Sequence, residues 1–315
     1  MKNIIIGKVK TDNVENFTTS FGIKVRRFIN PGLRKVLKLA TKRKIVLENY
    51  PVLEKNTPYI FASTHSFDED IIAALATIDR SAYVLMGTTD QIDYNPQMYA
   101  AWINGMVYVD RNNQQSRKDS VEKMVRVLNS GSSVLIFPEG GWNNTENLLV
   151  QPLFAGPYTL AQRTGAKVVP IATFNEHGSN EIHMSFGEPI DFNGQSKKEA
   201  LGTLRDALAT MMFTHMEKYS TPIKREDLTG DIRLKFMQER VDEYMRVKWT
   251  RDVWDEELAF YKDREIVFSE DVWDSLKDVE LTKHNAWIMQ PILERIKEND
   301  KYNFKKYIKQ NWNKK

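Results

Sequence analysis

Short apolar segments alternate with helix-forming segments over residues 44–220, and this alternation restricts the fold more than any other feature of the chain. The β-rich segments that we expect to be strands are 44–48, 59–63, 83–86, 106–109, 134–137, 168–173 and 182–186. Helical spacing is found in the segments 68–78, 115–128, 156–163 and 197–219. This pattern predicts an α/β domain in which a mixed, mostly parallel sheet is flanked by helices. Pro170, inside one expected strand, predicts an edge or a bulge there.

The N-terminal segment 1–43 is basic and amphipathic. Residues 1–45 contain twelve Lys and Arg against Asp12 and Glu15, so this segment carries roughly +10 although the whole chain carries +3. Apolar residues recur at helical spacing on both sides of Asn30-Pro31-Gly32, which predicts two helices joined at this corner. Two such helices suit an interfacial membrane anchor or surface helices packed on the core, and the pattern favours neither. The charge favours an anionic partner, either a membrane or a nucleic acid.

Residues 221–315 differ from the preceding region, because they are charged, rich in Trp and Tyr and poor in Gly. We interpret them as a helical C-terminal extension that caps the α/β core, with a second membrane-touching surface as the weaker alternative. The expected organisation is therefore 1–43 basic amphipathic helices, 44–220 the α/β domain and 221–315 the helical extension.

The composition limits the chemistry and the compartment. The chain has 315 residues and no cysteine, which excludes thiol nucleophiles, disulfides and thiolate metal sites. No segment approaches the roughly 20 apolar residues that span a bilayer, and the apolar run near the N-terminus is too short for a secretory signal. We expect a cytoplasmic protein that is peripheral at the inner face of the cell membrane.

The segment Ser63–Asp70 contains the residues best suited to catalysis. His65 follows the expected strand 59–63, and Asp70 lies in the first turn of the expected helix 68–78. Asp70 is near enough to accept a hydrogen bond from one imidazole nitrogen, which leaves the other nitrogen free as a general base. By residue type alone, Asp68 and Asp70 would more simply be acids at a helix start that interact with the helix dipole.

Four blocks occur in an order that resembles the glycerophosphate/lysophosphatidate acyltransferase family. The first block is the spacing His65-x4-Asp70, which is the signature of that family. The other blocks are Gly105–Arg111 (GMVYVDR), Phe137–Trp142 (FPEGGW) and Val168–Ala172 (VVPIA). The resemblance covers residues 44–190, and the ordered set is more specific than any one block.

This resemblance implies the reaction and the residues that perform it. A fatty acyl chain would move from an acyl thioester, on acyl carrier protein or coenzyme A, to a hydroxyl of lysophosphatidate or a related lysophospholipid. His65 would be the general base and Asp70 would orient it. The residues implied in acceptor binding are Gly105, Arg111, Pro138, Glu139 and Gly140. Neither a metal nor a cofactor is expected, the acyl donor acts as a co-substrate, and an acyl phosphate is an alternative donor.

One departure from the family pattern concerns the acceptor. The third block usually continues Glu-Gly-Thr-Arg, whereas Gly141 and Trp142 stand here in place of Thr-Arg. A cation for the acceptor phosphate would then come from Arg117, Lys118 or Arg163, or the acceptor is not lysophosphatidate. A non-catalytic lipid-binding protein on the same fold is a further alternative. No nucleic-acid partner is expected, because no recognised binding motif is present.

Overall fold

The computed structural model describes residues 13–15, 17–67, 69–87, 102–111, 113–143, 148–176 and 178–227, with a few positions between 279 and 293. The chain divides into two compact units, Met1–Val253 and Trp254–Lys315, and the fold below belongs to the first. The expected extension 221–315 lies almost entirely outside the described residues. The expected boundaries at residues 43 and 220 therefore remain predictions.

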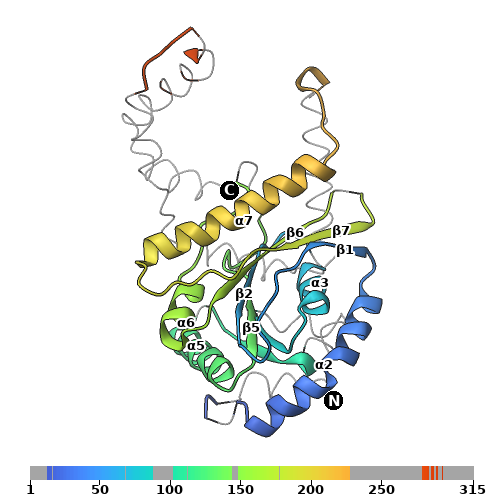
Figure 1. Ribbon diagram of the computed structural model, residues 1–315, viewed down its shortest axis with the longest axis vertical. Coiled ribbons are helices and arrows are strands. Elements are labelled where there is room, and N and C mark those ends of the chain that lie inside the picture. Colours follow the sequence, from blue (N-terminus) through green and yellow to red (C-terminus); the bar gives the residue numbers. More distant parts are fainter. Residues whose placement is uncertain are drawn as a thin grey trace. The chain divides into compact units, whose positions relative to one another are not determined.

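The strands of the described region form one seven-stranded sheet in the order β1-β7-β6-β2-β5-β3-β4 (Figure 1). Strands β6, β2, β5, β3 and β4 are parallel neighbours, whereas β7 runs antiparallel to β6 and pairs in parallel with β1. The predicted α/β class with a mostly parallel sheet is thus confirmed, and each expected strand has its counterpart. The strands are β1 Lys44–Asn49, β2 Ile60–Ser63, β3 Ala82–Met86, β4 Met106–Tyr108, β5 Ser133–Ile136, β6 Val168–Phe174 and β7 Glu181–Phe186.

Helices cover both faces of the sheet and bury its central strands (Figure 1). Phe61 of β2 packs with the helices of one face, α2 (Ser20–Ala40) and α3 (Asp70–Thr77). Its neighbour Ile60 points the other way and packs with α5, α6 and α7, as the period of two in a strand requires. These three helices are α5 Gln114–Asn129, α6 Gly156–Thr164 and α7 Lys197–Tyr219. None of the described helices is long and apolar enough to cross a bilayer.

The N-terminal segment corrects one prediction. Instead of two helices joined at Asn30-Pro31-Gly32, the structure has a single helix α2 that continues through Pro31. A proline inside a helix removes one backbone hydrogen bond, so packing must compensate. The buried Asn30 side chain donates from Nδ2 to Oδ1 of Asn104 at 3.1 Å, and Nδ2 of Asn104 donates to the carbonyl of Ala82 at 2.7 Å. These tertiary contacts hold α2 against the region of β3 and β4, although Asn30-Pro31-Gly32 locally favours a helix end.

Pro170 lies in β6, which is an interior strand of the sheet. The pairing of β6 with the returning chain uses Ile171 opposite Phe186 and Val168 opposite Ile190, so one extra residue stands on the returning side. The carbonyl of Pro170 accepts from the backbone N–H of Gly187 at 2.9 Å. The irregularity thus lies in the chain after β7, whereas β6 pairs with β2 through Pro170 without a register shift, so Pro170 occupies neither an edge strand nor a bulge of its own strand.

A cluster of titratable side chains fastens the end of α7 to the outer strands. Glu48 of β1 accepts hydrogen bonds from Lys218 at 2.6 Å and from the Tyr219 hydroxyl, and the Tyr219 ring stacks on His183 with centroids 3.5 Å apart. Burial raises the pKa of Glu48, but hydrogen bonds from Lys218, Tyr219 and His183 outweigh it and lower the pKa to about 2. Burial of His215 lowers its pKa to about 4.

These shifts predict how folding stability depends on pH. The unfolded chain protonates His215 near pH 6.5, whereas the folded chain resists protonation until about pH 4, so stability should fall as pH drops through this window. The Glu48 contribution should be lost at lower pH, between about 4.5 and 2. His215→Leu should flatten the first window and leave the second. Urea unfolding at a series of pH values measures this, and equal pH slopes for the two proteins would contradict the account.

Candidate functional site

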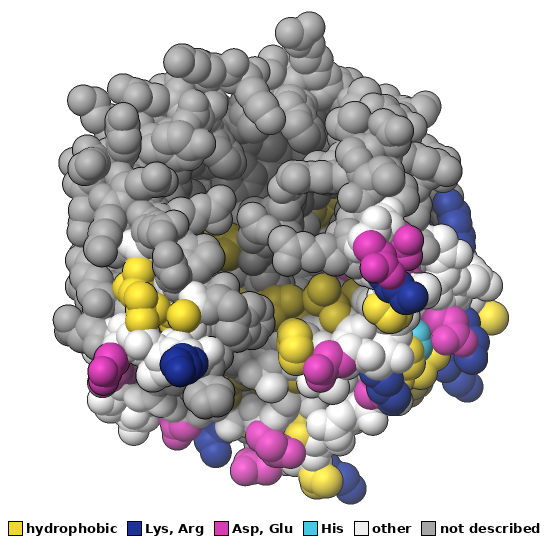
Figure 2. Space-filling view, turned by 90° about the horizontal axis from the view of Figure 1, so that it is seen from above, with side chains coloured by type: hydrophobic (Ala, Val, Ile, Leu, Met, Phe, Trp, Pro, Cys, Tyr) yellow, Lys and Arg dark blue, Asp and Glu magenta, His cyan; other side chains and the backbone are white. Residues whose placement is uncertain are grey.

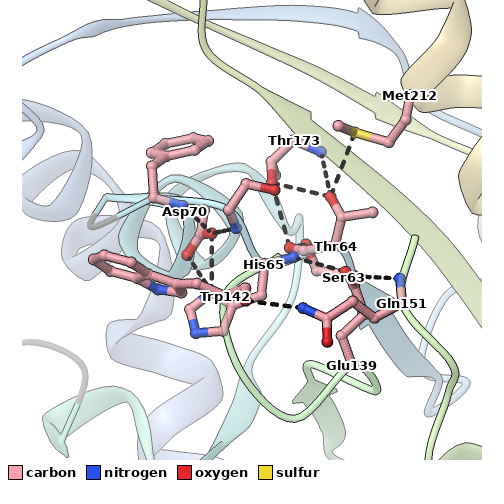
Figure 3. A network of polar contacts seen from close by, with 11 residues as sticks. Ser63, Thr64, His65, Asp70, Glu139, Trp142, Gln151, Thr173 and Met212 are labelled. Atoms are coloured by element: carbon pink, nitrogen blue, oxygen red, sulfur yellow. Dashed lines mark hydrogen bonds and ion pairs between the residues drawn. The ribbon is translucent and has the colours of Figure 1, made fainter. Parts of the chain in front are cut away.

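His65 and Asp70 form a close pair where β2 ends and α3 begins (Figure 3). Nδ1 of His65 lies 2.9 Å from Oδ2 and 3.0 Å from Oδ1 of Asp70. The Asp70 side chain is completely buried, whereas the His65 side chain keeps 14% of its surface exposed. A carboxylate at Nδ1 places the ring proton there, so Nε2 carries a lone pair. No described residue makes a hydrogen bond with Nε2, so the pair can act as a base toward a bound hydroxyl.

The loop between the two residues folds around the Asp70 carboxylate. Oδ2 of Asp70 accepts the backbone N–H of Ser66 at 2.8 Å and that of Phe67 at 3.2 Å. A buried carboxylate needs such donors, because its loss of hydration is otherwise costly. On the other side, the backbone N–H of Thr64 donates to the carbonyl of Ile171 at 3.0 Å, which keeps the end of β2 in the sheet. His65 is therefore fixed from both sides.

Glu139 follows β5 and is fully buried. Its Oε1 accepts the backbone N–H of His65 at 3.2 Å, and its Oε2 accepts the backbone N–H of Gln151 at 2.8 Å. The carboxylate thus joins the His65 loop to the segment that contains Gln151 (Figure 3). The resemblance implied acceptor binding by Glu139. The structure adds a positioning role, because both carboxylate oxygens accept backbone N–H groups, of His65 and of Gln151.

Pro138 and Gly140 stand on either side of Glu139 in the turn after β5. The carbonyl of Pro138 accepts the backbone N–H of Phe154 at 2.8 Å. Gly140 has a φ of 77°, a conformation that favours glycine, and its backbone N–H donates to the carbonyl of Phe137 at 2.9 Å. Both residues therefore lie at the same edge of the sheet as His65.

Arg111 follows β4 and lies at this edge, whereas Gly105 does not. A Cβ atom on Gly87, the residue after β3, would come within 2.3 Å of Nε of Arg111, so the guanidinium covers the end of β3. Gly105 precedes β4 and is therefore at the amino end of that strand. Its φ of 126° favours glycine, and a Cβ atom there would collide with the ring of Tyr83, so the backbone conformation accounts for this residue. The structure brings Arg111 and not Gly105 to the edge that carries His65.

Several residues of the site could not be identified from the sequence. Gln151 and Gly87 stand outside every motif, although a glycine directly after a strand is a usable signal for close packing. The sequence also did not predict that two aromatic rings pack beside the His65 imidazole. The Phe137 and Trp142 ring centroids lie 4.4 Å and 6.0 Å from that of the His65 imidazole.

Substitution of Glu139 should destabilise the protein strongly. Glu139→Ala leaves two buried backbone N–H groups without this acceptor, which should lower the free energy of unfolding by about 2–5 kcal/mol. Glu139→Gln should cost less, because the amide oxygen still accepts one of them. The matched control is Glu122→Ala, which removes an exposed pair with Arg163 and should cost less than about 1 kcal/mol. Equal losses for the two alanine variants in urea unfolding would overturn this role of Glu139.

Comparisons with known proteins show what the chain is similar to. Residues 44–173 match the family model described as Acyltransferase. The chain is 29% identical over 125 residues to the chloroplastic 1-acyl-sn-glycerol-3-phosphate acyltransferase BAT2 of Brassica napus, a match that covers 40% of this chain and 35% of that protein. It is 25% identical over 139 residues to the 1-acyl-sn-glycerol-3-phosphate acyltransferase of Haemophilus influenzae, which covers 41% of this chain and 55% of that protein.

The chain thus spans between a third and about half of the length of the curated relatives it matches. A crystal structure of the 1-acyl-sn-glycerophosphate (LPA) acyltransferase PlsC from Thermotoga maritima is similar with a TM-score of 0.48 and 16% identity, covering 70% of this chain and 89% of that chain. Residues 44–173 are thus similar to the acyltransferase family, and the curated relatives that match are 1-acyl-sn-glycerol-3-phosphate acyltransferases.

Proposed function

We propose that this chain is an O-acyltransferase that moves a fatty acyl chain from an acyl thioester to a hydroxyl of lysophosphatidate or a related lysophospholipid. The observation that carries the proposal is the contact of Nδ1 of His65 with the buried Asp70 carboxylate, which leaves Nε2 available as a base. The substrate class comes from the printed names of the relatives. Acyl carrier protein and coenzyme A are the donors that fit a thioester.

The reaction requires one base that later returns its proton. Nε2 of His65 takes the proton of the acceptor hydroxyl as the oxygen attacks the acyl carbon, and the Asp70 carboxylate stabilises the imidazolium that forms. The carbon–sulfur bond then breaks, and the imidazolium gives the proton to the leaving thiolate. The products are an ester and a free thiol, so neither a metal nor a redox cofactor takes part in this scheme.

Arg111 is the cation that we propose for the acceptor phosphate. Strands β2, β5, β3 and β4 are consecutive neighbours, so His65 and Arg111 project from strands roughly 14 Å apart at one edge of the sheet. The planar guanidinium suits a phosphate that it contacts through two N–H groups. Arg163, an alternative cation, forms an ion pair with Glu122 on α5, so it is less suited to this role.

Substitution of the base should abolish acyl transfer in a folded protein. His65→Ala should lower kcat by about 10²–10⁴-fold. His215→Leu, a histidine outside the site, serves as the matched control and should keep its activity. The assay uses labelled acyl thioesters with glycerol 3-phosphate, lysophosphatidate and lysophospholipids of larger head group. Activity only on a lysophospholipid of larger head group would support the proposed reaction but change the proposed acceptor. Full activity of His65→Ala would exclude the mechanism.

We further propose that the protein attaches peripherally to an anionic membrane surface, at the cytoplasmic face, through helix α2. The helix buries Ile23, Asn30 and Leu37 against the domain, so its opposite face is turned outward. At 100° per residue, five exposed apolar side chains of this outer face fall within an arc of about 80°. They are Phe21 (76% exposed), Val25 (39%), Phe28 (87%), Val36 (55%) and Leu39 (86%).

Three exposed lysines flank this apolar stripe on one side, namely Lys24, Lys35 and Lys38. Apolar side chains bordered by lysines are typical of a helix that lies in the interface of an anionic membrane. Arg34 on the inner side donates from Nη2 to the carbonyl of Thr77, the last residue of α3, at 3.2 Å. Because Asp70 begins α3, a docked α2 would hold the site close to its lipid substrate.

Removal of the apolar stripe should weaken membrane binding. Phe21→Ser together with Phe28→Ser should reduce binding to vesicles that contain anionic lipid by at least about tenfold, because two large apolar side chains no longer insert. Val52→Ser, at a fully exposed valine outside α2, is the matched control. Each neutralised lysine should cost roughly fivefold on anionic vesicles and little on neutral ones. Unchanged vesicle binding by the double variant would contradict the assignment of α2.

A further inference from the structure

The geometry points to Trp142 as a positioning residue that holds the His65 imidazole in its reactive orientation. This inference rests on the proposed function, in which Nε2 of His65 is the base. It concerns a residue that the acyl-transfer scheme does not itself use.

The indole of Trp142 stands directly beside the imidazole of His65 (Figure 3). The two ring centroids are 6.0 Å apart and the ring planes are perpendicular. The Phe137 ring lies 4.4 Å from the same imidazole at an interplanar angle of 37°. Two aromatic rings of different orientation therefore pack against the base.

These rings supply a restraint that Asp70 alone does not. The last torsion of a histidine side chain is soft, with broad minima, so neighbours must define the ring plane. The contacts between Nδ1 and the Asp70 carboxylate fix one corner of the ring, at 2.9 and 3.0 Å. Rotation about that corner would move Nε2, and the perpendicular indole blocks this rotation.

Trp142 itself is held in place by hydrogen bonds of its backbone and of its neighbour. Nε2 of Gln151 donates to the carbonyl of Trp142 at 2.9 Å, and the backbone N–H of Asn143 donates to the carbonyl of His65 at 2.7 Å. Glu139 links the backbone of His65 with that of Gln151. These contacts form a closed circuit that joins the backbone of Trp142 to the backbone of His65.

Figure 2 shows hydrophobic side chains of the described residues gathered on one face of the molecule, among scattered charged ones. An apolar wall for the acceptor is the competing explanation of an indole that lies beside His65. The two explanations predict different kinetics. A wall contributes to binding and would change KM, whereas a positioning residue changes kcat.

The test compares Trp142→Leu with Trp142→Phe in acyl transfer. Leucine keeps an apolar side chain but no planar ring, so kcat should fall about 10–100-fold with KM for the acceptor changed less than threefold. Phenylalanine should restore kcat to within about threefold of the unsubstituted protein. The matched control is Trp102→Leu. The carbonyl of Trp102 accepts the backbone N–H of Gly105, before β4 and away from the strand ends that carry His65, so this substitution should leave kcat unchanged. A raised KM with unchanged kcat, or no effect, would overturn the inference.

A second measurement does not depend on activity. NMR relaxation of the His65 ring C–H groups, assigned with a His65→Gln variant, reports the order parameter of the imidazole. The order parameter should fall in Trp142→Leu and recover in Trp142→Phe. An unchanged order parameter in Trp142→Leu would overturn the inference. Absence of transfer by the unsubstituted protein would instead reject the proposed function, and the relaxation data would still decide the role of Trp142.

Discussion

The rest of the site depends on the hydrogen bonds that the buried Asp70 carboxylate accepts. The carboxylate accepts from two backbone N–H groups of the loop and from Nδ1 of His65, and no part of its side chain reaches solvent. Desolvation of a carboxylate is costly unless several donors surround it, so the loop has one favourable conformation. That conformation fixes the tautomer and the position of the imidazole together. The chemistry proposed for the chain follows from this one arrangement.

The sheet brings the other groups to the same place from distant parts of the chain. Parallel strands all end at one edge, and His65 and Glu139, which are 74 residues apart in sequence, meet there through a hydrogen bond. The same topology places Arg111 two strands beyond Glu139. Helix α2 packs against α3 and turns its apolar stripe outward. A lipid surface bound by α2 would thus lie beside the helix whose first residue, Asp70, contacts His65.

The sequence was informative wherever local signals and tertiary packing agree. The central strands could be predicted because apolar runs such as Ile60–Ser63 are buried on both faces of the sheet. The prediction of a helix break at Pro31 was wrong, because the buried contact of Asn30 with Asn104 outweighs the loss of one helical hydrogen bond. An amphipathic pattern also cannot tell which apolar residues face the core, and Phe28 faces outward. The hydrogen bond from the backbone N–H of Gln151 to the Glu139 carboxylate could not be predicted, because no sequence spacing indicates a side-chain contact with backbone.

A double-mutant cycle of His65→Ala and Asp70→Asn in acyl transfer tests the central claim most directly. If Asp70 acts only by holding His65 and stabilising its imidazolium, the double variant should be no slower than His65→Ala alone, so that the two losses are strongly non-additive. Circular dichroism and urea unfolding establish that each variant is folded. Additive losses in kcat, or a cycle in which His65→Ala has no effect, would contradict the account of a single base oriented by a buried carboxylate.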